Sequence, residues 1–386
     1  MRHLSWLTLF SVMSACSKGA TTVETEASTC DEGFTRGEDG NCYENTEGTE
    51  PEAKPEEADL IWPDAEWQEG SPADHGLDAS KLEAFRAYTF RDGHNTQAVV
   101  VIKDGVLVAE WYADGTDRDT PVTTWSAGKS VTSALFGVGL REGLLELDDP
   151  VGDYVPEWSE GENADITIRH LLEMRSGLPS NFSNPYGLYG EEPDQLSYSL
   201  DREPIRLPGQ IFEYVNEDTM VLGHVLTQAF GQHVTDIAAD EIFGPIGLDG
   251  TWWTDGRDNT LAYCCIDTTA RSFSRFGLLY ARGGKWKDTQ IVPNDFVTAS
   301  TTGISYYGYY GMQWWTYGDL YAAVGYHGQL LYVYPEQDMV VARFGNYTHW
   351  GDGYDRVGYN YHETFDYGTF DQSIFATLFL DAIIDD

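Results

Sequence analysis

Two residues with the chemistry of a covalent catalyst, Ser126 and Lys129, lie three positions apart in the chain. Apolar residues continue with helical spacing after Lys129, so we expect a helix over residues 129–142. Because residues three apart share one face of a helix, the lysine ammonium can reach the serine hydroxyl. The start of a helix also offers N–H groups to a developing oxyanion. The pair therefore predicts a serine nucleophile; the alternative is a capping serine followed by a solvent-facing lysine.

A tyrosine and an asparagine with complementary chemistry, Tyr214 and Asn216, occur on an expected loop before a helix. The phenol has a reference pKa of about 10, and a neighbouring Lys129 ammonium would favour the phenolate. Tyr214 could then take the proton of Ser126 and pass it to a leaving group. Asn216 could hold the lysine or bind a substrate carbonyl. The alternative is a packed tyrosine beside a capping asparagine.

Hydrophobic patterning places these residues among strands and helices. Apolar runs over residues 98–102 and 106–112, separated by Lys-Asp-Gly, predict a hairpin. Strands at both ends of the domain with helices between them predict a two-lobed α/β fold: a mainly antiparallel sheet built from both ends and flanked by helices, plus an all-helical lobe. Helices are expected over 79–88, 167–174, 218–230, 268–281 and 373–384, and further strands over 320–325, 330–334 and 339–344.

The charge balance narrows the range of partners. The chain has 63 acidic and 23 basic residues, a formal net charge of −40. Such a surface repels phosphate backbones, which argues against nucleic-acid binding. A heavily solvated surface explains the charge, with capture of a cationic substrate as the alternative. No Cys/His spacing resembles a zinc site, so we expect neither a metal nor an organic cofactor.

The N-terminus has the features of an export signal. Arg2 is followed by a short apolar run over residues 4–13 and by Ser-Ala-Cys ending at Cys16. This resembles the lipobox of bacterial lipoproteins, so residues 1–16 are predicted to be a lipoprotein-type signal peptide with Cys16 as the lipidation site; simple secretion is the alternative. The expected location is the outer membrane, periplasm or cell surface, with the lipid as the membrane attachment.

Residues 17–70 are acidic and poor in aliphatic residues, which predicts a disordered tether. Export permits disulfides, so Cys30 and Cys42 are expected to close a small loop within it. The hydrolase domain is expected over residues 71–386. Cys264 and Cys265 are adjacent, and because neighbouring cysteines form a strained ring, we expect them to be unbonded, buried apolar groups.

The order of these groups resembles that of the serine β-lactamase and D,D-peptidase superfamily, which uses Ser-x-x-Lys, Tyr-x-Asn and a Lys/His-Thr-Gly-like strand triplet. Residues 125–130 and 325–329 most resemble the 6-aminohexanoate-dimer hydrolases, which group with class C β-lactamases and family VIII esterases. An α/β-hydrolase elbow is not present, because Thr124 replaces its first glycine. The resemblance extends from residue 76 to the C-terminus and includes residues 99–105, 147–150, 166–172 and 174–178.

The resemblance implies that a strand beside the nucleophile supplies an oxyanion donor. In one register the triplet is Ala323-Val324-Gly325, and the backbone N–H of Tyr326 is the donor beside that of Ser126. In the other register it is His327-Gly328-Gln329. We favour the first, because Tyr-His-Gly-Gln is typical of a turn between two apolar strands.

The implied activity is hydrolysis of small-molecule esters or amides through an acyl-enzyme on Ser126, with Lys129 and Tyr214 handling protons. The residues expected to bind substrate are Asn216, Gly325, His327 and Trp125. In the favoured register Ala323 stands where β-lactamases place a cation. A substrate carboxylate would lose a charge-assisted hydrogen bond there, worth about 1.5–3 kcal/mol. The alternatives are a D,D-carboxypeptidase or β-lactamase, and a non-catalytic surface binding protein. The sequence does not indicate an oligomeric state.

Overall fold

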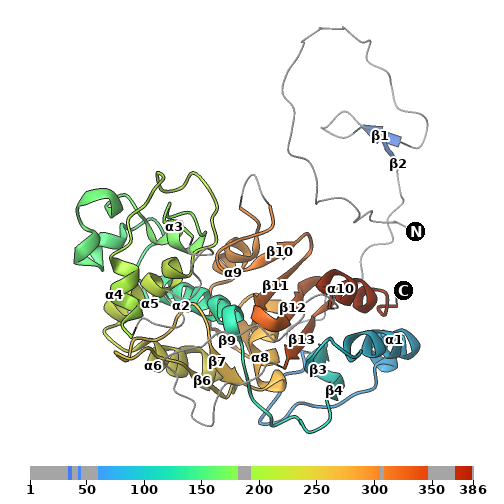
Figure 1. Ribbon diagram of the computed structural model, residues 1–386. Helices are drawn as coiled ribbons and strands as arrows, with labels where there is room; N and C mark the ends of the chain where they lie inside the picture. The colour runs from blue at the N-terminus through green and yellow to red at the C-terminus, as the bar shows by residue number, and fades with distance from the viewer. Residues whose placement is uncertain are drawn as a thin grey trace. The chain divides into compact units, whose positions relative to one another are not determined.

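The computed structural model describes residues 34–36, 42–44, 60–180, 193–304, 308–346 and 370–384 (Figure 1). The chain divides into two compact units, residues Met1–Glu56 and Glu57–Asp386. In the first unit, β1 (Phe34–Arg36) and β2 (Cys42–Glu44) form an antiparallel pair, which is regular structure inside the segment expected to be disordered. Cys16 and Cys30 lie outside the described residues, so the predicted lipidation site and Cys30–Cys42 loop remain predictions.

A six-stranded antiparallel sheet forms the centre of the second unit, in the order β10-β11-β12-β13-β3-β4. The first two strands of this unit join the last four through the pairing of β13 with β3. This confirms the prediction of a sheet built from both ends of the domain. The strands are β3 (Thr96–Lys103), β4 (Val106–Tyr112), β10 (Trp315–Tyr317), β11 (Leu320–Gly325), β12 (Gln329–Tyr334) and β13 (Met339–Gly345).

Helices cover both faces of the sheet, which explains why its central strands are continuous apolar runs. On one face the first and last helices, α1 (Ala79–Thr89) and α10 (Gln372–Leu380), pack together. Phe85 of α1 lies with its ring centroid 4.7 Å from that of Phe375 in α10. On the opposite face α8 (Ala270–Ala281) packs against β12, β13 and β3 (Figure 1).

The chain between β4 and α8 forms the predicted helical lobe. Its central helix, α2 (Lys129–Arg141), is buried along nearly its whole length, as expected of a helix that is apolar on most faces. It packs against α5 (Asn216–Phe230). The other helices are α3 (Ile168–Leu172), α4 (Gln195–Leu200), α6 (Val234–Ala238) and α7 (Gly244–Ile246), and α9 (Asn294–Thr301) follows α8.

A small three-stranded sheet supports the start of α2. Its order is β5-β7-β6, from β5 (Val122–Thr123), β6 (Gly250–Trp252) and β7 (Ile266–Thr268). The sequence analysis did not predict this sheet, because strands of two or three residues are too short to show alternation. A further two-stranded hairpin joins β8 (Lys285–Trp286) to β9 (Thr289–Gln290).

The predicted start of the folded domain at residue 71 is wrong, because residues 60–70 pack into it. The side chain of Trp67 is 6% exposed, and its indole N–H donates to the Arg271 carbonyl at 3.0 Å. The backbone of residues 68–70 exchanges hydrogen bonds with Leu107 of β4. The sequence analysis missed this segment because it is acidic and its few aromatic residues are too sparse to form a periodic hydrophobic pattern. Across the described parts of the chain, no helix combines the length and apolar character needed to cross a bilayer.

Candidate active site

Ser126 lies in a tight turn between β5 and α2. Residues Trp125–Gly128 form a single 3-10 turn that leads into α2 at Lys129. Thr124 fixes the turn to β7: its N–H donates to the Ile266 carbonyl at 2.9 Å, and its hydroxyl accepts from the Ile266 N–H at 3.0 Å. The predicted placement of Ser126 at the start of a helix is therefore what the structure shows.

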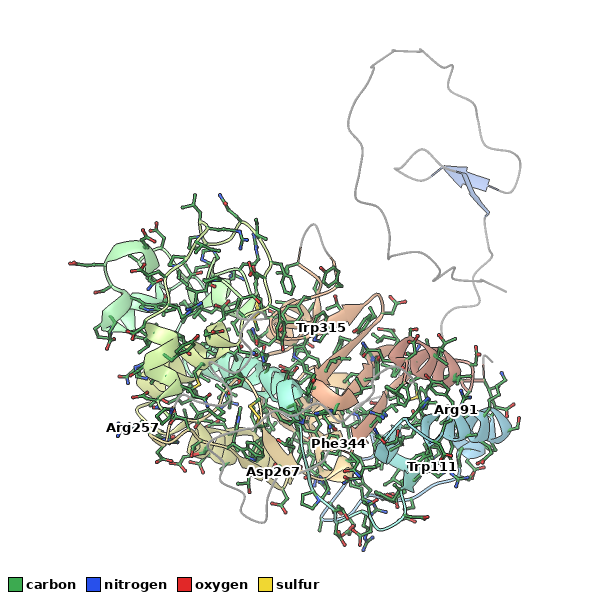
Figure 2. The ribbon with its side chains drawn as sticks, viewed as in Figure 1. Arg91, Trp111, Arg257, Asp267, Trp315 and Phe344 are labelled. Atoms are coloured by element: carbon green, nitrogen blue, oxygen red, sulfur yellow. A yellow bond between two sulfur atoms is a disulfide. The ribbon has the colours of Figure 1, made fainter. Side chains whose placement is uncertain are left out.

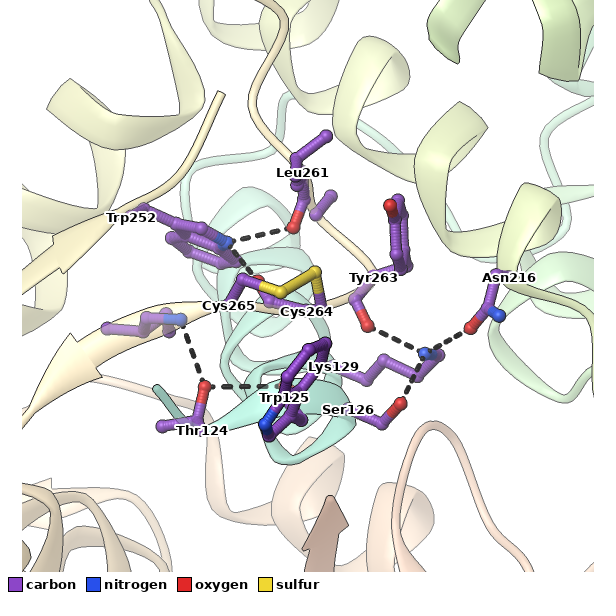
Figure 3. Close-up of a disulfide and its surroundings, with 12 residues drawn as sticks. Thr124, Trp125, Ser126, Lys129, Asn216, Trp252, Leu261, Tyr263, Cys264 and Cys265 are labelled. Atoms are coloured by element: carbon purple, nitrogen blue, oxygen red, sulfur yellow. Dashed lines mark hydrogen bonds between the residues drawn. A yellow bond between two sulfur atoms is a disulfide. The ribbon is translucent and has the colours of Figure 1, made fainter. Parts of the chain in front are cut away.

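Lys129 lies at the centre of the site, and its side chain points at three oxygen atoms (Figure 3). Its Nζ atom lies 3.2 Å from the Oγ of Ser126 and 2.6 Å from the Oδ1 of Asn216. It also lies 2.6 Å from the backbone carbonyl oxygen of Tyr263. Sequence reasoning missed the third contact, because a backbone carbonyl leaves no signature in the residue type.

The charge state of Lys129 is set by its surroundings. Burial lowers its pKa well below the ordinary lysine value, and the buried carboxylate of Glu217 opposes this shift. In the neutral form the amine has two N–H donors and one lone pair. Asn216 Oδ1 and the Tyr263 carbonyl can only accept, so they take the two N–H groups. As an ammonium, Lys129 donates to the Ser126 hydroxyl at this distance; as a neutral amine, it would direct its lone pair at the same hydroxyl.

Tyr214 completes the contact with the nucleophile. Burial raises its pKa above the ordinary tyrosine value, and a side-chain hydrogen bond with Ser126 lowers it in part. The Nζ of Lys129 lies 4.9 Å from the centroid of the Tyr214 ring. The structure thus brings together Ser126, Lys129, Tyr214 and Asn216, as the sequence indicated. It differs from the expected charges, because burial favours a neutral lysine and a neutral tyrosine over an ammonium and a phenolate.

The loop before α5 is held by the segment that follows α3. The Glu213 N–H donates to the Met174 carbonyl at 2.9 Å, and the Val215 N–H points at the Met174 sulfur at 3.4 Å. These two bonds flank Tyr214 and fix its backbone. In the same region the hydroxyl of Ser176 donates to the carboxyl of Asp218 at 2.6 Å. Burial raises the pKa of that carboxyl well above its usual value.

The end of β11 approaches the nucleophile turn closely. A Cβ atom added at Gly325 would lie 2.2 Å from the carbonyl oxygen of Thr124 and 3.2 Å from the nitrogen of Ala127. Glycine is therefore required at this position. The turn after the strand occupies Tyr326–Gly328, so Ala323, Val324 and Gly325 are on β11, as the favoured register requires.

Aromatic rings surround the end of this strand. The Trp125 ring centroid lies 6.0 Å from that of Tyr326 and 5.8 Å from that of His327. His327 has a left-handed backbone, with φ of 60°, and burial lowers its pKa to about 4, so the imidazole is neutral at neutral pH. Gln329, the last residue of the other register, is buried and bonds both backbone groups of Gly345. Neither register therefore offers a permanent cation.

A second group of aromatic rings, which we call the aromatic wall, extends from Tyr214 towards solvent. Trp315 on β10 stacks on Tyr214 at a centroid distance of 6.0 Å and is labelled in Figure 2. Tyr309 stacks on Trp315 at 6.4 Å and is 39% exposed. The aromatic wall consists of Phe212, Tyr309, Tyr310 and Trp315.

The expectation that Cys264 and Cys265 are unbonded is wrong: the two residues form a disulfide with each other (Figure 3). Both are buried, at 2% and 1% exposure, as expected. The local backbone accommodates the small ring, because Cys265 has a left-handed φ of 71°. Within the described ranges, no cluster of three or more His, Cys, Asp or Glu side chains could hold a metal ion.

The comparisons with known proteins place the chain in a family of hydrolases. The profile of the Beta-lactamase family matches residues 83–364, and the chain belongs to that family of hydrolases. Among curated relatives, the 6-aminohexanoate-dimer hydrolase of Paenarthrobacter ureafaciens is 22% identical over 66% of this chain and 75% of its own. Other curated relatives are matched over shorter stretches; Protein flp of Staphylococcus aureus (strain MW2), for example, is covered over 35% of its length.

Solved structures show the same fold. The octameric penicillin-binding protein homologue of Pyrococcus abyssi superposes with a TM-score of 0.58 at 20% identity, covering 70% of this chain and 74% of that one. The D-stereospecific amidohydrolase of a Streptomyces species superposes with a TM-score of 0.53 at 19% identity, covering 69% of this chain and 94% of that one.

Proposed function

We propose that this Beta-lactamase-family hydrolase cleaves small-molecule esters or amides through an acyl-enzyme on Ser126. The observation that carries the proposal is the environment of Lys129: its amine faces two obligate acceptors and one hydroxyl. That arrangement suits a neutral amine that receives a proton from Ser126 as the serine attacks. Burial supports the neutral form, because it lowers the lysine pKa.

The proposed reaction has two stages. The Ser126 oxygen adds to the substrate carbonyl carbon while its proton passes to Lys129, and the carbonyl electrons move to the oxygen as an oxyanion. The backbone N–H groups of Ser126 and Tyr326 stabilise that oxyanion. Tyr214 donates its hydroxyl proton to the leaving group as the carbon–heteroatom bond breaks, and recovers a proton from Lys129. In the second stage water attacks the acyl carbon while its proton passes to Lys129. The bond to Ser126 Oγ then breaks, and Lys129 returns the proton to Ser126.

The site favours substrates that place no carboxylate next to the triplet Ala323-Val324-Gly325. Ala323 is 1% exposed, and the nearby His327 is neutral at neutral pH. A neutral or cationic substituent suits this site and a strongly acidic protein better than an anion does. The similarity to a 6-aminohexanoate-dimer hydrolase supports hydrolysis of a small molecule.

Burst kinetics on the full chain test the proposal. With p-nitrophenyl acetate and butyrate, we expect a burst of nitrophenolate stoichiometric with enzyme, and an acyl mass increment on the peptide that contains Ser126. Ser126→Ala should abolish both, whereas Ser80→Ala, an exposed serine on α1, should leave both unchanged. Unchanged turnover in Ser126→Ala would remove Ser126 as the nucleophile.

A β-lactamase or D,D-carboxypeptidase is the second candidate, and membership of the Beta-lactamase family favours it. Nitrocefin hydrolysis or labelling by a fluorescent penicillin, lost in Ser126→Ala, would support it over the esterase/amidase. If no ester, amide or β-lactam reacts and no probe labels Ser126, a non-catalytic surface binding protein becomes the better description.

We also propose that the chain is exported and anchored by lipid at Cys16, because a charged residue, an apolar run and Ser-Ala-Cys occur in that order. Detergent phase partitioning of the protein expressed in a bacterial host tests this. The wild type should enter the detergent phase with a lipid mass on Cys16, and Cys16→Ala should remain in the aqueous phase. Aqueous partitioning of the wild type would instead favour simple secretion.

A further inference from the structure

We propose that the Cys264–Cys265 disulfide is a positioning element of the active site: it fixes the Tyr263 carbonyl on Lys129 and supports the turn that carries Ser126. Its catalytic consequence rests on the proposed serine-hydrolase function. Its structural consequence, the placement of an acceptor on Lys129, does not.

The disulfide is covalently next to the carbonyl that contacts Lys129. The Tyr263 carbonyl and the Cys264 nitrogen share one planar peptide group, and the Cys264 N–H donates to the Leu261 carbonyl at 2.9 Å. The S–S bond closes a ring through the following peptide. That ring restricts ψ of Cys264 and φ of Cys265, and so holds the Cα atom of Cys264 in place. With that Cα atom held, the hydrogen bond from the Cys264 N–H to Leu261 sets the plane of the Tyr263–Cys264 peptide and the direction of the Tyr263 carbonyl.

The same pair of cysteines rests against the nucleophile turn. The Cys265 N–H donates to the carbonyl of Trp125, the residue before Ser126, at 3.2 Å. At the other end of the turn, a Cβ atom added at Gly128 would lie 3.1 Å from the carbonyl carbon of Cys264. One covalently closed unit thus abuts both ends of the turn that positions Ser126 and Lys129.

The unit is anchored on its far side to the small sheet. The carbonyl of Cys264 accepts from the Trp252 indole N–H at 2.7 Å (Figure 3). The carbonyl of Cys265 accepts from the Trp253 N–H at 3.0 Å. Together with the two N–H contacts, all four backbone polar groups of the pair are satisfied. A loop with a left-handed residue at Cys265 is thereby held in one conformation, which non-glycine residues seldom adopt on their own.

Loss of the bond should change Lys129 in a defined direction. The groups that face its amine are Glu217 on α5 and the rings of Tyr214 and Tyr263, besides Ser126 and Asn216. If the Tyr263 carbonyl moves away while Lys129 stays buried, the ammonium form of Lys129 loses an acceptor and the neutral form is favoured further. The pKa of Lys129 should therefore fall.

The test compares the full-length wild type with Cys264→Ser/Cys265→Ser and Cys264→Ala/Cys265→Ala. Alkylation and mass spectrometry under denaturing conditions first establish the bond in the wild type. Lysine labelled with ¹³C at Cε then gives the Lys129 titration by NMR, assigned with Lys129→Arg. We expect both variants to titrate at lower pH than the wild type, and kcat for p-nitrophenyl butyrate to fall at least about tenfold with little change in KM.

Leu82→Ala, a core truncation in α1, is the control for general loss of stability, and it should leave the Lys129 titration unchanged. Wild-type cysteines that are not linked, or a Lys129 titration that is unchanged or moves upward in the double variants, would overturn the inference. The two proposals can fail separately: if the wild type shows no Ser126-dependent turnover, the proposed function fails, and the titration still decides the role of the disulfide.

Discussion

The Nζ atom of Lys129 lies 3.2 Å from the Oγ of Ser126, in a site where the lysine side chain is 1% exposed. The pair is close enough for direct proton transfer, and burial favours the neutral amine that must receive the proton. Asn216 Oδ1 and the Tyr263 carbonyl oxygen accept the other hydrogen bonds of this amine. The geometry thus links the protonation of one residue to the nucleophilicity of the other.

The pH dependence of kcat/KM should report Lys129. Only the neutral amine can act as base, so we expect kcat/KM to rise with pH through the lysine pKa, with a midpoint well below the 10.5 of an ordinary lysine. Glu217 raises that pKa, so Glu217→Gln should move the midpoint to lower pH. Ester hydrolysis measured across the pH range checks both shifts. The exposed Asp236→Asn is the matched control, and an upward or absent shift in Glu217→Gln would contradict the assignment.

Removing the Tyr214 hydroxyl should impair proton transfer while leaving the ring in place. We expect Tyr214→Phe to lower kcat by roughly 10²–10⁴-fold, the usual contribution of a positioned acid–base group. The loss should be greater for an anilide or amide than for a p-nitrophenyl ester, because nitrophenolate leaves without being protonated. Parallel assays of both substrate types measure this difference. Tyr198→Phe in α4 should leave both rates intact, and equal losses on the two substrates would argue against leaving-group protonation by Tyr214.

The approach of β11 to the nucleophile turn predicts a severe effect of one methyl group. Gly325→Ala would place its Cβ 2.2 Å from the Thr124 carbonyl, so the strand must move away from Ser126. If Tyr326 supplies an oxyanion N–H, kcat should drop by roughly 10²–10³-fold. Gly231→Ala is the control: it ends α5 at a φ of 64° with open space around it, and should lower stability without affecting kcat. Normal kcat in a folded Gly325→Ala protein would remove Tyr326 from the site.

The aromatic wall should contribute to binding of bulky substrates. Trp315 is partly exposed and stacks on Tyr214, so its loss should weaken contacts with long or aromatic groups more than with small ones. We expect Trp315→Ala to raise KM for p-nitrophenyl butyrate more than for the acetate. Trp111→Ala, a partly buried tryptophan on β4, is the matched control. A uniform fall in kcat for both esters would instead indicate that Trp315 supports Tyr214.

The parts of the fold and site that the sequence predicts are those with local signatures. The apolar run before residue 103 must be a strand buried on both faces, and the structure places it at the centre of the sheet as part of β3. Ser126 and Lys129 are recognisable because their spacing is helical. Tyr214 and Asn216 are a weak signal alone and become recognisable through the order of the three motifs, which resembles that of the serine β-lactamase and D,D-peptidase superfamily. The contact of Asn216 with Lys129 spans 87 residues of sequence.

The features that escaped prediction have non-local causes. The Tyr263 carbonyl contacts Lys129 through backbone, which any residue type supplies. The bond between Cys264 and Cys265 depends on a left-handed backbone that adjacent cysteines alone do not indicate. The lowered pKa of Lys129 follows from burial by the assembled helical lobe and sheet, whereas the sequence suggested only a positive charge beside a tyrosine.

The segment before residue 71 provides a direct test of the corrected domain boundary. Trp67 is buried, its indole N–H bonds the Arg271 carbonyl, and the guanidinium of Arg275 lies 5.4 Å from its ring centroid. Trp67→Ala should therefore lower the free energy of unfolding by about 3–5 kcal/mol. A chain that begins at Ser71 should lose at least as much, because it also lacks the backbone pairing with Leu107.

Denaturant unfolding of both variants beside the wild type measures these losses. Gln68→Ala keeps the backbone pairing and changes an exposed side chain in the same segment, so it is expected to unfold within about 0.5 kcal/mol of the wild type. If the chain that begins at Ser71 were as stable as the wild type, residues 60–70 would contact the domain without stabilising it, and the boundary at residue 71 would stand. Because Arg271 and Arg275 are both in α8, which packs on the sheet, we expect the loss to destabilise α8 and the sheet as well as residues 60–70.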